Sequence, residues 1–382
     1  MSGSQPGQCG YRRAAAAAAM AMFTGFLLLL FSLVATASAA TAAFNLTTLP
    51  FDDGFSHLFG NDNLVRSGDG RGARLTLNRY SGTYPRSLVR VFIESNIGLV
   101  IEKAFCGGLG SGFISSDLYH HGFFSASIRL PSDYTAGVVV AFYTSNGDVF
   151  EKTHDELDFE FLGNIRGRDW RIQTNVYGNG STSRGREERY VLPFDPTAEA
   201  HQYSILWTAD RIMFYIDDVP IREVVRSGAM GGDYPSKPMS VYATIWDGST
   251  WATANGKYKV NYKYAPFAAD LSDFVLRGCR VDPIQLVDSA RRCADAQDEL
   301  RASPIAVMTP RKRDAMRRFR KRYMTYSFCY DTKRYPVPFP DCDIVPSEQT
   351  RFLDSGNSKF RHDLRRSRRQ SRKPTPDGEI SN

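Results

Sequence analysis

The stretch HDELDFEFLG at residues 154–163 alternates polar and apolar side chains along its length. In a β-strand, successive side chains point to opposite faces, so one face of this segment would bury Leu157, Phe159 and Phe161 in a core. The other face would carry His154, Glu156, Asp158 and Glu160. The alternation therefore predicts a strand with one apolar face and one strongly acidic face.

Strand-like segments continue on both sides of this stretch. From about residue 50 to residue 275, short runs rich in Val, Ile, Phe and Tyr alternate with Gly, Pro, Asn and Asp, and helical periodicity is nearly absent. Turn pairs such as Asn146-Gly147 and Asp217-Asp218 separate them. The clearest runs are 122–130, 137–143, 155–162, 172–177, 202–208, 211–216 and 240–245. We therefore predict an all-β fold, a β-sandwich or jelly roll, in a single domain.

The pattern changes towards the C-terminus. Residues 284–301 and 311–326 have helical patterns, and Met316, Phe319 and Tyr323 form an apolar stripe under a strongly basic face of the second helix. A strand-like MTYSF follows. We expect an extension packed on the sandwich up to residue 345, and then a basic disordered tail over 346–382.

Charge is distributed unevenly along the 382 residues. The net charge of +7 alone would suggest a polyanionic partner. Residues 311–322 contribute +7, the last 28 residues +5 and the first forty +2, so the rest of the chain carries −7. Two local patches therefore account for the basicity, and we expect no nucleic-acid partner, because the chain begins with a secretory signal.

That signal consists of Arg12 and Arg13, an apolar run over 14–34 and the small residues Ala37-Ser38-Ala39. We predict a signal peptide over residues 1–39, with an uncleaved membrane anchor as the alternative. Cleavage would release a chain without a membrane segment into an oxidising compartment. The sequons at Asn45 and Asn179 suit a secreted glycoprotein.

Four cysteines lie near the C-terminus at local spacings of 14 and 13 residues. The spacings favour disulfides between Cys279 and Cys293 and between Cys329 and Cys342, although four cysteines allow three connectivities. A four-cysteine zinc site is disfavoured because no CxxC pair is present. Cys106 is left unpaired.

The acidic face of 154–163 suggests a chemistry. Three carboxylates on one strand face repel one another, so a fold has little structural reason to gather them. Retaining cleavage of a glycosidic bond needs a carboxylate nucleophile and a carboxylic acid that flank the bond. We assign Glu156 as the nucleophile, Glu160 as the acid/base, and Asp158 as the residue that orients Glu156 and whose charge keeps Glu160 protonated. His154 would be a bordering positioning residue; the alternatives are an acidic solvated strand and a cation site.

The same segment resembles the H-D-E-[IL]-D-F-E-F-L-G signature of plant xyloglucan endotransglucosylase/hydrolases, members of glycoside hydrolase family 16. The similarity extends over most of the mature chain, through GFSHLFGNDNLVRS, YSILWTADRIMFYIDDVPIREV and CYDTKRYP. The C-terminal region resembles the subgroup with extended C-termini. This resemblance implies a concanavalin-like β-jelly-roll catalytic domain over 40–275 and a disulfide-pinned helical extension over 276–345.

The resemblance also implies sugar-binding residues. Amide side chains at 173–175 suit a neutral polysaccharide, and the segment at 185–187 lacks the Asn that is usual in the family. The loop WDGSTWATANG at 246–256 has Thr250 where Asp is usual and Asn255 where Gly is usual. Its tryptophans would stack on sugar rings, with burial in the core as the alternative, whereas Trp207 is expected in the core. The implied substrate-binding residues are Glu160, Gln173, Thr174, Asn175, Gly185, Arg186, Glu187, Trp246, Thr250, Trp251, Asn255 and Arg334.

One segment departs from the family pattern. Family members pass directly from the equivalent of Tyr80-Ser81-Gly82 to that of Ser111-Gly112-Phe113, so residues 83–110 are an insertion. A loop of this length costs little closure entropy, but its apolar runs fit poorly with exposure to solvent. We interpret it as a retained intron or gene-model error; a functional loop is the alternative.

The resemblance implies a secreted enzyme of the cell wall and apoplast that cuts xyloglucan and rejoins it to a xyloglucan or oligosaccharide acceptor. We expect no cofactor, no metal and a monomer, with anionic pectin as a partner of the basic tail. The alternatives are a xyloglucan-specific hydrolase, a non-catalytic glucan-binding jelly roll, and an enzyme disabled by the insertion.

Overall fold

The computed structural model describes residues 46–81, 89–90, 102–103, 110–167, 169–282 and 286–359. The chain divides into two units, Met1–Leu46 and Thr47–Asn382, and all the described helices and strands belong to the second. The predicted signal peptide, the Asn45 sequon, Cys106 and the tail beyond residue 359 lie outside the described residues. Of the segment 83–110, the structure describes two short paired strands and Gly110, which begins a longer strand. The paired strands are β4 (Val89–Arg90) and β5 (Glu102–Lys103).

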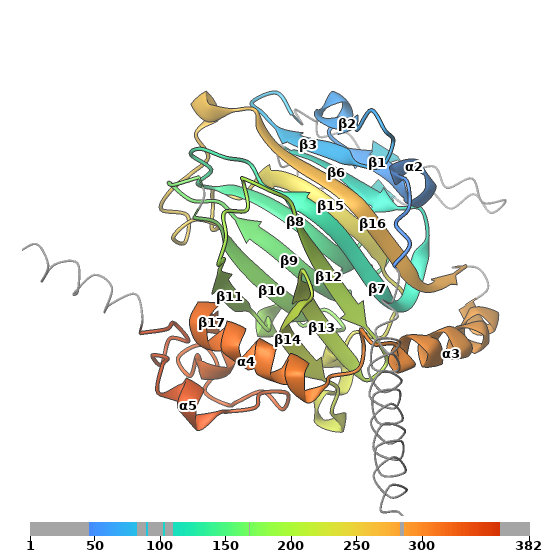
Figure 1. The fold of residues 1–382 in the computed structure, drawn as a ribbon, viewed down its shortest axis with the longest axis vertical. Coiled ribbons are helices and arrows are strands. Elements are labelled where there is room, and N and C mark those ends of the chain that lie inside the picture. The colour runs from blue at the N-terminus through green and yellow to red at the C-terminus, as the bar shows by residue number, and fades with distance from the viewer. Residues whose placement is uncertain are drawn as a thin grey trace, which may run out of the picture. The chain divides into compact units, whose positions relative to one another are not determined.

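Two antiparallel sheets form the sandwich (Figure 1). The eight-stranded sheet contains, in spatial order, β1 (Phe55–Phe59), β6 (Gly110–Ser115), β15 (Ser240–Asp247), β8 (Val138–Ser145), β9 (Glu156–Leu162), β10 (Arg171–Tyr177), β11 (Glu188–Val191) and β17 (Met324–Ser327). The seven-stranded sheet contains β14 (Val219–Val225), β13 (Arg211–Ile216), β12 (His201–Trp207), β7 (Leu118–Arg129), β16 (Phe267–Val281), β3 (Ala73–Leu77) and β2 (Leu64–Arg66). The seven predicted strand runs are confirmed, and the predicted boundary at residue 275 falls inside β16.

The core lies between the sheets and confirms the alternation of β9. Leu157, Phe159 and Phe161 are fully buried, and Phe159 packs edge-on against Tyr203 and Phe214 of the seven-stranded sheet. Burying a side chain of this size contributes about 1.5–3 kcal/mol. Trp207 is also fully buried, as predicted. The other face of β9, here called the outer face, is therefore the one that carries the carboxylates.

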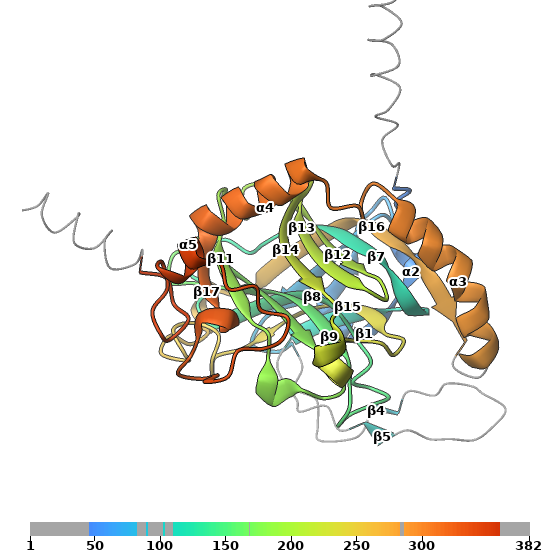
Figure 2. The same cartoon turned by 90° about the horizontal axis from the view of Figure 1, so that it is seen from below.

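Helices cover parts of the seven-stranded sheet (Figure 2). Helix α3 (Leu286–Ala302) packs on β16 and β7, and α4 (Pro310–Tyr323) packs mainly on β14. Thr309 caps α4, since its hydroxyl accepts a hydrogen bond from the Lys312 amide at 3.2 Å. The short helices are α2 (Phe51–Gly54), α5 (Pro346–Gln349), η1 (Asn61–Asn63), η2 (Thr182–Arg184), η3 (Gly228–Asp233), η4 (Tyr262–Tyr264) and η5 (Phe328–Tyr330). Both predicted helices are confirmed, although α4 ends at Tyr323 and residues 324–327 form β17.

Both predicted disulfides are present. Cys279 pairs with Cys293 and Cys329 with Cys342, at Cα–Cα distances of 5.3 and 5.5 Å. The zinc alternative is therefore wrong. These disulfides connect α3 to β16 and close the loop that follows β17.

The predicted start of the disordered tail at residue 346 is wrong for residues 346–359. Pro346–Gln349 forms α5, and the ring of Phe352 is buried and stacks on Tyr330 at 4.7 Å. Asn357 forms a bridge with Tyr326 of β17. A single buried aromatic anchors the segment, which the basic composition of the region had hidden.

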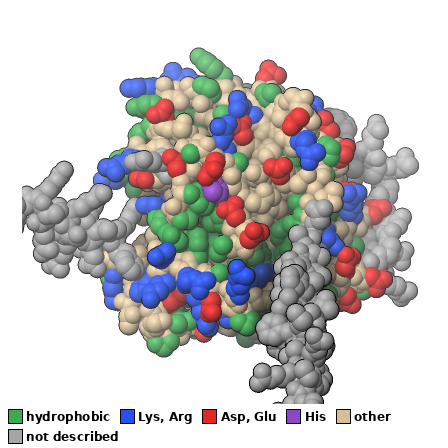
Figure 3. Space-filling model, in the orientation of Figure 1, with side chains coloured by type: hydrophobic (Ala, Val, Ile, Leu, Met, Phe, Trp, Pro, Cys, Tyr) green, Lys and Arg blue, Asp and Glu red, His purple; other side chains and the backbone are tan. Residues whose placement is uncertain are grey.

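The basic face of α4 is divided between solvent and a buried ionic cluster. Figure 3 shows a row of basic side chains over α4. On this helix, the side chains of Arg318 and Arg322 are exposed to solvent. Phe319 packs against Tyr190, as the predicted apolar stripe requires. Arg320, next to it, points inwards and contacts Glu188 of β11.

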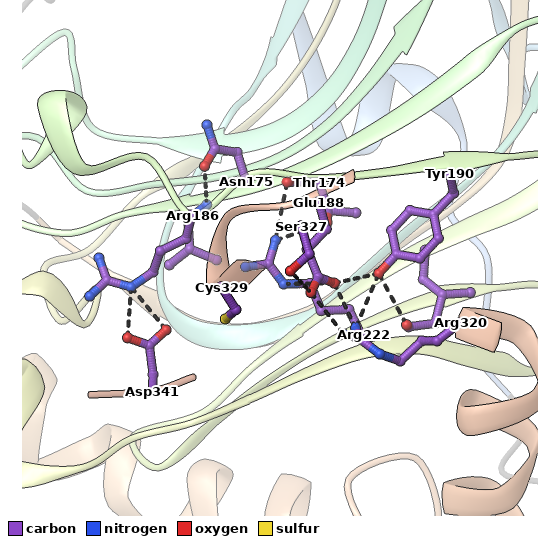
Figure 4. Close-up of polar contacts among 12 residues, drawn as sticks. Thr174, Asn175, Arg186, Glu188, Tyr190, Arg222, Arg320, Ser327, Cys329 and Asp341 are labelled. Carbon is purple, nitrogen blue, oxygen red and sulfur yellow. Dashed lines mark hydrogen bonds and ion pairs between the residues drawn. The ribbon is translucent and has the colours of Figure 1, made fainter. Parts of the chain in front are cut away.

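We call this the Glu188 cluster (Figure 4); it comprises Glu188, Tyr190, Arg222, Arg320 and Ser327. Arg320 donates to both oxygens of Glu188 at 2.7 and 2.9 Å. The Tyr190 hydroxyl donates to Oε2 of Glu188 at 2.5 Å. Burial alone would raise the pKa of Glu188, but Arg320 and Arg222 lower it to about 2. The cluster thus joins the edge of the sandwich to the C-terminal extension.

Replacing Arg320 with Met should destabilise the protein by about 3–5 kcal/mol, because Glu188 would lose its main counter-ion while buried. Thermal or urea unfolding measures this, with Arg318→Met on the exposed face of the same helix as the control, expected within about 0.5 kcal/mol of wild type. The difference should shrink at acid pH. The pKa of Glu188 is lower in the folded protein than in the unfolded chain. Its ion pairs therefore contribute fully to the free energy of unfolding above the unfolded pKa, and this contribution is lost as pH falls towards about 2. Equal stability of the two variants at neutral pH would contradict this account.

Ser111, which directly follows the insertion, lies against Thr76 on β3, the strand that precedes the insertion. The Ser111 hydroxyl accepts from the Thr76 amide and donates to the Thr76 carbonyl, both at 3.0 Å. Gly110 lies against β15, where an added Cβ would approach the Ile245 carbonyl oxygen to 2.1 Å. A glycine is therefore required at this position.

Deleting residues 83–110 would join Gly82 to Ser111 and supply that glycine. We expect the shortened protein to fold with a melting temperature equal to or above that of wild type, because shortening a connection lowers its closure entropy cost. Differential scanning calorimetry of the two secreted proteins measures this. Failure of the shortened chain to fold would show that the segment is a structural part of the domain.

Candidate active site

The outer face of β9 brings Glu156, Asp158 and Glu160 together in one row along the strand, as predicted. Antiparallel register places Ser145 and Tyr177 beside Glu156, Tyr143 and Asn175 beside Asp158, and Ala141 and Gln173 beside Glu160. Asp158 is 5% exposed, whereas both glutamates are partly exposed. The two glutamates are thus accessible on either side of a buried aspartate.

Burial determines the protonation of Asp158. Its pKa is raised well above the ordinary value by burial first, and then by the charges of Glu156 and Glu160. A hydrogen bond joins it to Glu156. A raised pKa favours the protonated form of Asp158, which makes Asp158 the better donor of the two in this bond.

The pKa of Glu156, the predicted nucleophile, is raised overall, although several groups act to lower it. Burial raises its pKa, but a hydrogen bond from Ser145, the nearby His154 and the hydrogen bond with Asp158 all oppose that rise. His154 borders the row as predicted, with its Nδ1 3.2 Å from the Glu151 carbonyl oxygen and its ring 6.3 Å from that of Tyr177.

Glu160 has the properties of a general acid. Burial raises its pKa to about 7; the hydrogen bond from Gln173 and the charge of Arg189 act to lower it, while Glu156 and Glu187 act to raise it. We expected the charge of Asp158 to keep Glu160 protonated, but the pKa of Asp158 is itself raised well above the ordinary value, which disfavours that charge. Burial and the charges of Glu156 and Glu187 have that effect instead.

Gln173 and Asn175 share the outer face with the carboxylates, but Thr174 does not. Gln173 donates from Nε2 to Oε2 of Glu160 at 2.5 Å. The Thr174 hydroxyl accepts from Arg222 at 2.9 Å on the core side of the sheet (Figure 4). The predicted sugar contact by the Thr174 side chain is therefore wrong, because adjacent residues of a strand cannot share a face.

Neighbouring residues of the segment 185–187 also face different surroundings: Glu187 contacts other site residues, whereas Arg186 is buried. Glu187 accepts from Arg189 at 3.1 Å and from Arg334 of the extension at 3.0 Å, so the structure brings these predicted site residues together. Arg186 is fully buried, pairs with Asp341 and Asp233 at 3.0 and 3.1 Å, and stacks on Phe339. Its predicted sugar contact is wrong; its side chain holds the loop against the extension. The Gly185 carbonyl accepts from the Tyr335 hydroxyl at 3.1 Å.

The two tryptophans of the 246–256 loop lie on the outer face. Trp246 pairs with Val139, which is next to Leu162 in the same row. The rings of Trp246 and Trp251 are 6.0 Å apart, and both are partly buried against a small apolar cluster outside the main core. The core alternative is therefore wrong for them. Thr250 and Asn255 of the same loop are exposed, and Asn255 adopts the left-handed conformation, with φ of 56°.

Sequence analysis did not identify several residues that shape the site. Tyr143 and Tyr177 face the carboxylates, whose charges help to raise the pKa of both phenols beyond what burial does. Asp155 is fully buried and accepts from the backbone amides of Asn179, Ser236 and Lys237 at 2.7–2.8 Å. Its position next to Glu156 and its inward orientation follow from the alternation of the segment, but its partners depend on distant loops.

Comparisons with known proteins agree with this geometry. Residues 51–264 match the model of glycosyl hydrolases family 16, and residues 296–342 match that of the xyloglucan endo-transglycosylase C-terminus. A probable xyloglucan endotransglucosylase/hydrolase, protein 30 of Arabidopsis thaliana, is 56% identical over 353 residues, covering 91% of this chain and 93% of the relative. The chain belongs to the xyloglucan endotransglucosylase/hydrolase family. Protein 29 of this family in the same plant is 50% identical, over 86% of this chain and 88% of its own.

Membership of the xyloglucan endotransglucosylase/hydrolase family identifies the chain as a family 16 glycoside hydrolase or transglycosylase. The alternative of an acidic solvated strand does not fit the row, because Asp158 at its centre is buried. As in the family models, the β-sandwich and the C-terminal region are distinct matches, and in this chain β17 of that region completes the eight-stranded sheet. Within the residues that the structure describes, no helix is long and apolar enough to cross a membrane.

The neutral state of Asp158 can be tested with two substitutions. Asp158→Asn keeps a neutral donor towards Glu156 and should lower kcat about tenfold, whereas Asp158→Ala removes the donor and should lower it about a hundredfold or more. Steady-state kinetics with xyloglucan as donor measures both. If Asn were as damaging as Ala, the negative charge of Asp158, and not its hydrogen bond, would be what Glu156 requires.

Proposed function

We propose that the protein is a xyloglucan endotransglucosylase, which cuts the β-1,4-glucan backbone with retention and rejoins the new end to another xyloglucan chain. The observation that carries this proposal is the row on β9, where the partly exposed Glu156 and Glu160 flank a buried Asp158 whose pKa is raised well above the ordinary value. The relatives at 56% and 50% identity are named as xyloglucan endotransglucosylase/hydrolases, which supports xyloglucan as the substrate.

In the first half of the reaction, Glu160 gives its proton to the glycosidic oxygen while Glu156 attacks the anomeric carbon. The bond between that carbon and the glycosidic oxygen breaks, the chain beyond it leaves as an alcohol, and a glycosyl ester forms on Glu156. In the second half, the now ionised Glu160 takes a proton from an acceptor hydroxyl. That oxygen attacks the anomeric carbon and releases Glu156, so retention follows from two inversions.

A hydrolase and a transglucosylase share these steps and differ only in which hydroxyl resolves the ester. A difference of a few kcal/mol in barrier height decides between water and sugar. Support for transfer comes from the extension: Arg334 reaches Glu187 beside the catalytic row and adds a polar surface that a sugar acceptor could contact. We infer that this surface favours a xyloglucan or oligosaccharide acceptor over water.

The proposal includes a place of action. We propose that the mature protein is secreted to the cell wall and apoplast as a monomer, carries a glycan on the exposed Asn179, and contacts anionic pectin through its basic C-terminal tail. The two disulfides support an oxidising compartment.

Purified protein should be incubated with xyloglucan, with and without a labelled xyloglucan oligosaccharide, while chain length and label transfer are followed. We expect incorporation of label and little chain shortening without acceptor. Glu156→Ala should abolish transfer by more than about a thousandfold, the scale on which loss of a covalent nucleophile acts. Chain shortening that is independent of acceptor would identify a hydrolase, and full transfer by Glu156→Ala would refute the nucleophile.

A further inference from the structure

Arg189 of β11 stands in line with the proposed acid/base on the outer face. Strand register places Glu160 opposite Gln173, Gln173 opposite Arg189, and Arg189 opposite Tyr326. These four residues come from four adjacent strands, β9, β10, β11 and β17. A side chain on β11 can therefore act on Glu160 only through Gln173 or through space.

The contacts within this line have a fixed direction. Oε1 of Gln173 accepts from Nε of Arg189 at 2.6 Å, and Nε2 of Gln173 donates to Oε2 of Glu160 at 2.5 Å. A guanidinium has donors only, so the amide must turn its oxygen towards Arg189. Its NH2 group is then left facing Glu160.

Arg189 itself is held from two further sides. Its Nη2 donates to Glu187 at 3.1 Å, and its guanidinium lies 5.2 Å from the centre of the Tyr326 ring. The extension fixes both supports, because Arg334 pairs with Glu187 at 3.0 Å and Asp331 accepts from the Tyr326 hydroxyl at 2.9 Å. These contacts hold the guanidinium of Arg189 in one orientation. The orientation of the Gln173 amide depends on it, because the amide oxygen accepts from this guanidinium.

We propose that Arg189 is a positioning residue that locks the Gln173 amide with its NH2 group towards Glu160, so that the proton of Glu160 stays available to the glycosidic oxygen. This rests on the proposed role of Glu160 as acid/base. With the amide reversed, its oxygen would accept the Glu160 proton and compete with the substrate. In the locked orientation, the amide can only donate, and it stabilises the carboxylate that remains after the proton has gone.

Several charged or titratable groups face Glu160, and they set the direction in which its pKa responds. They are Glu156 and Asp158 on β9, Tyr143 on β8, Tyr177 on β10, Glu187 directly before β11, and Arg189 on β11. Among them, Glu187 raises and Arg189 lowers the pKa of Glu160, which burial places at about 7. Removing Arg189 should therefore raise this pKa, and a reversed amide would raise it further.

A double-mutant cycle tests whether Arg189 acts through Gln173. Arg189→Met, which keeps a long stem against Tyr326, should lower kcat by about tenfold, on the scale of a partly misdirected general acid. In a Gln173→Met background, the same substitution should change kcat by less than about twofold, because the amide that it orients is gone. Equal effects in both backgrounds would overturn the proposal.

The pH dependence of kcat/KM adds a readout that a merely structural role would not move. Activity falls as pH rises through the pKa of Glu160, so this basic limb should move to higher pH in Arg189→Met and to lower pH in Glu187→Gln. Arg189→Lys keeps the charge but cannot make the hydrogen bonds to both Gln173 and Glu187. The basic limb of its pH profile should therefore move less than that of Arg189→Met, while its kcat still falls. A limb that stays in place in Arg189→Met would overturn the proposal.

Direct titration of Glu160 separates this inference from the proposed function. In protein labelled with ¹³C at glutamate side chains, the pKa of Glu160 should rise in Arg189→Met and stay unchanged in Arg211→Gln, a control that removes a similarly buried strand arginine from the other sheet. An unchanged pKa in Arg189→Met overturns the inference whatever the activity. A raised pKa in a protein whose wild type does not act on xyloglucan leaves the positioning intact and overturns the proposed function alone.

Discussion

The structure depends on the requirement that β9 satisfy two opposite environments at once. Its core face needs close apolar packing, which Leu157, Phe159 and Phe161 provide, and this packing fixes the register that gathers three carboxylates on the outer face. Three ionised carboxylates would repel one another strongly in so buried a row. Keeping Asp158 protonated relieves that repulsion and turns the aspartate into a donor for Glu156.

β11 repeats this division between faces and connects it to the C-terminal extension. Glu188 points inwards to Arg320 and Arg222, while Glu187 and Arg189 point outwards to the catalytic row. The extension touches both faces, through α4 on the inner side and through Tyr326 and Arg334 on the outer side. It is therefore part of the site, and the described end of the chain, with Phe352 packed on Tyr330, stabilises the strand that completes the sheet.

Sequence alone predicted what depends on local periodicity and spacing: the strands, α3 and α4, the row of carboxylates on one face of β9, and the cysteine pairs. It could not give the partners of a residue, because these depend on register between distant strands; Arg189 and Asp155 were missed for this reason. Thr174 is different, since the alternation that predicted β9 already forbids three consecutive strand residues from facing one sugar. Arg186 was misjudged because the resemblance placed it among the sugar-binding residues, whereas it is buried against Asp341. Arg320 was not singled out, because composition does not tell a solvated arginine from one that contacts Glu188.

The same electrostatic account explains why such an acidic row suits a neutral polysaccharide. Asp158 is neutral, Glu160 is largely protonated below about pH 7, and Glu187 is paired with two arginines. In the row, Glu156 is then the carboxylate left to carry the negative charge before the proposed reaction, because Ser145, His154 and Asp158 oppose the rise in its pKa. Retaining cleavage develops positive charge at the anomeric carbon, the atom that Glu156 attacks, so the remaining charge lies where the transition state can use it. In the proposed reaction, burial therefore divides three carboxylates into one nucleophile, one acid and one hydrogen-bond donor.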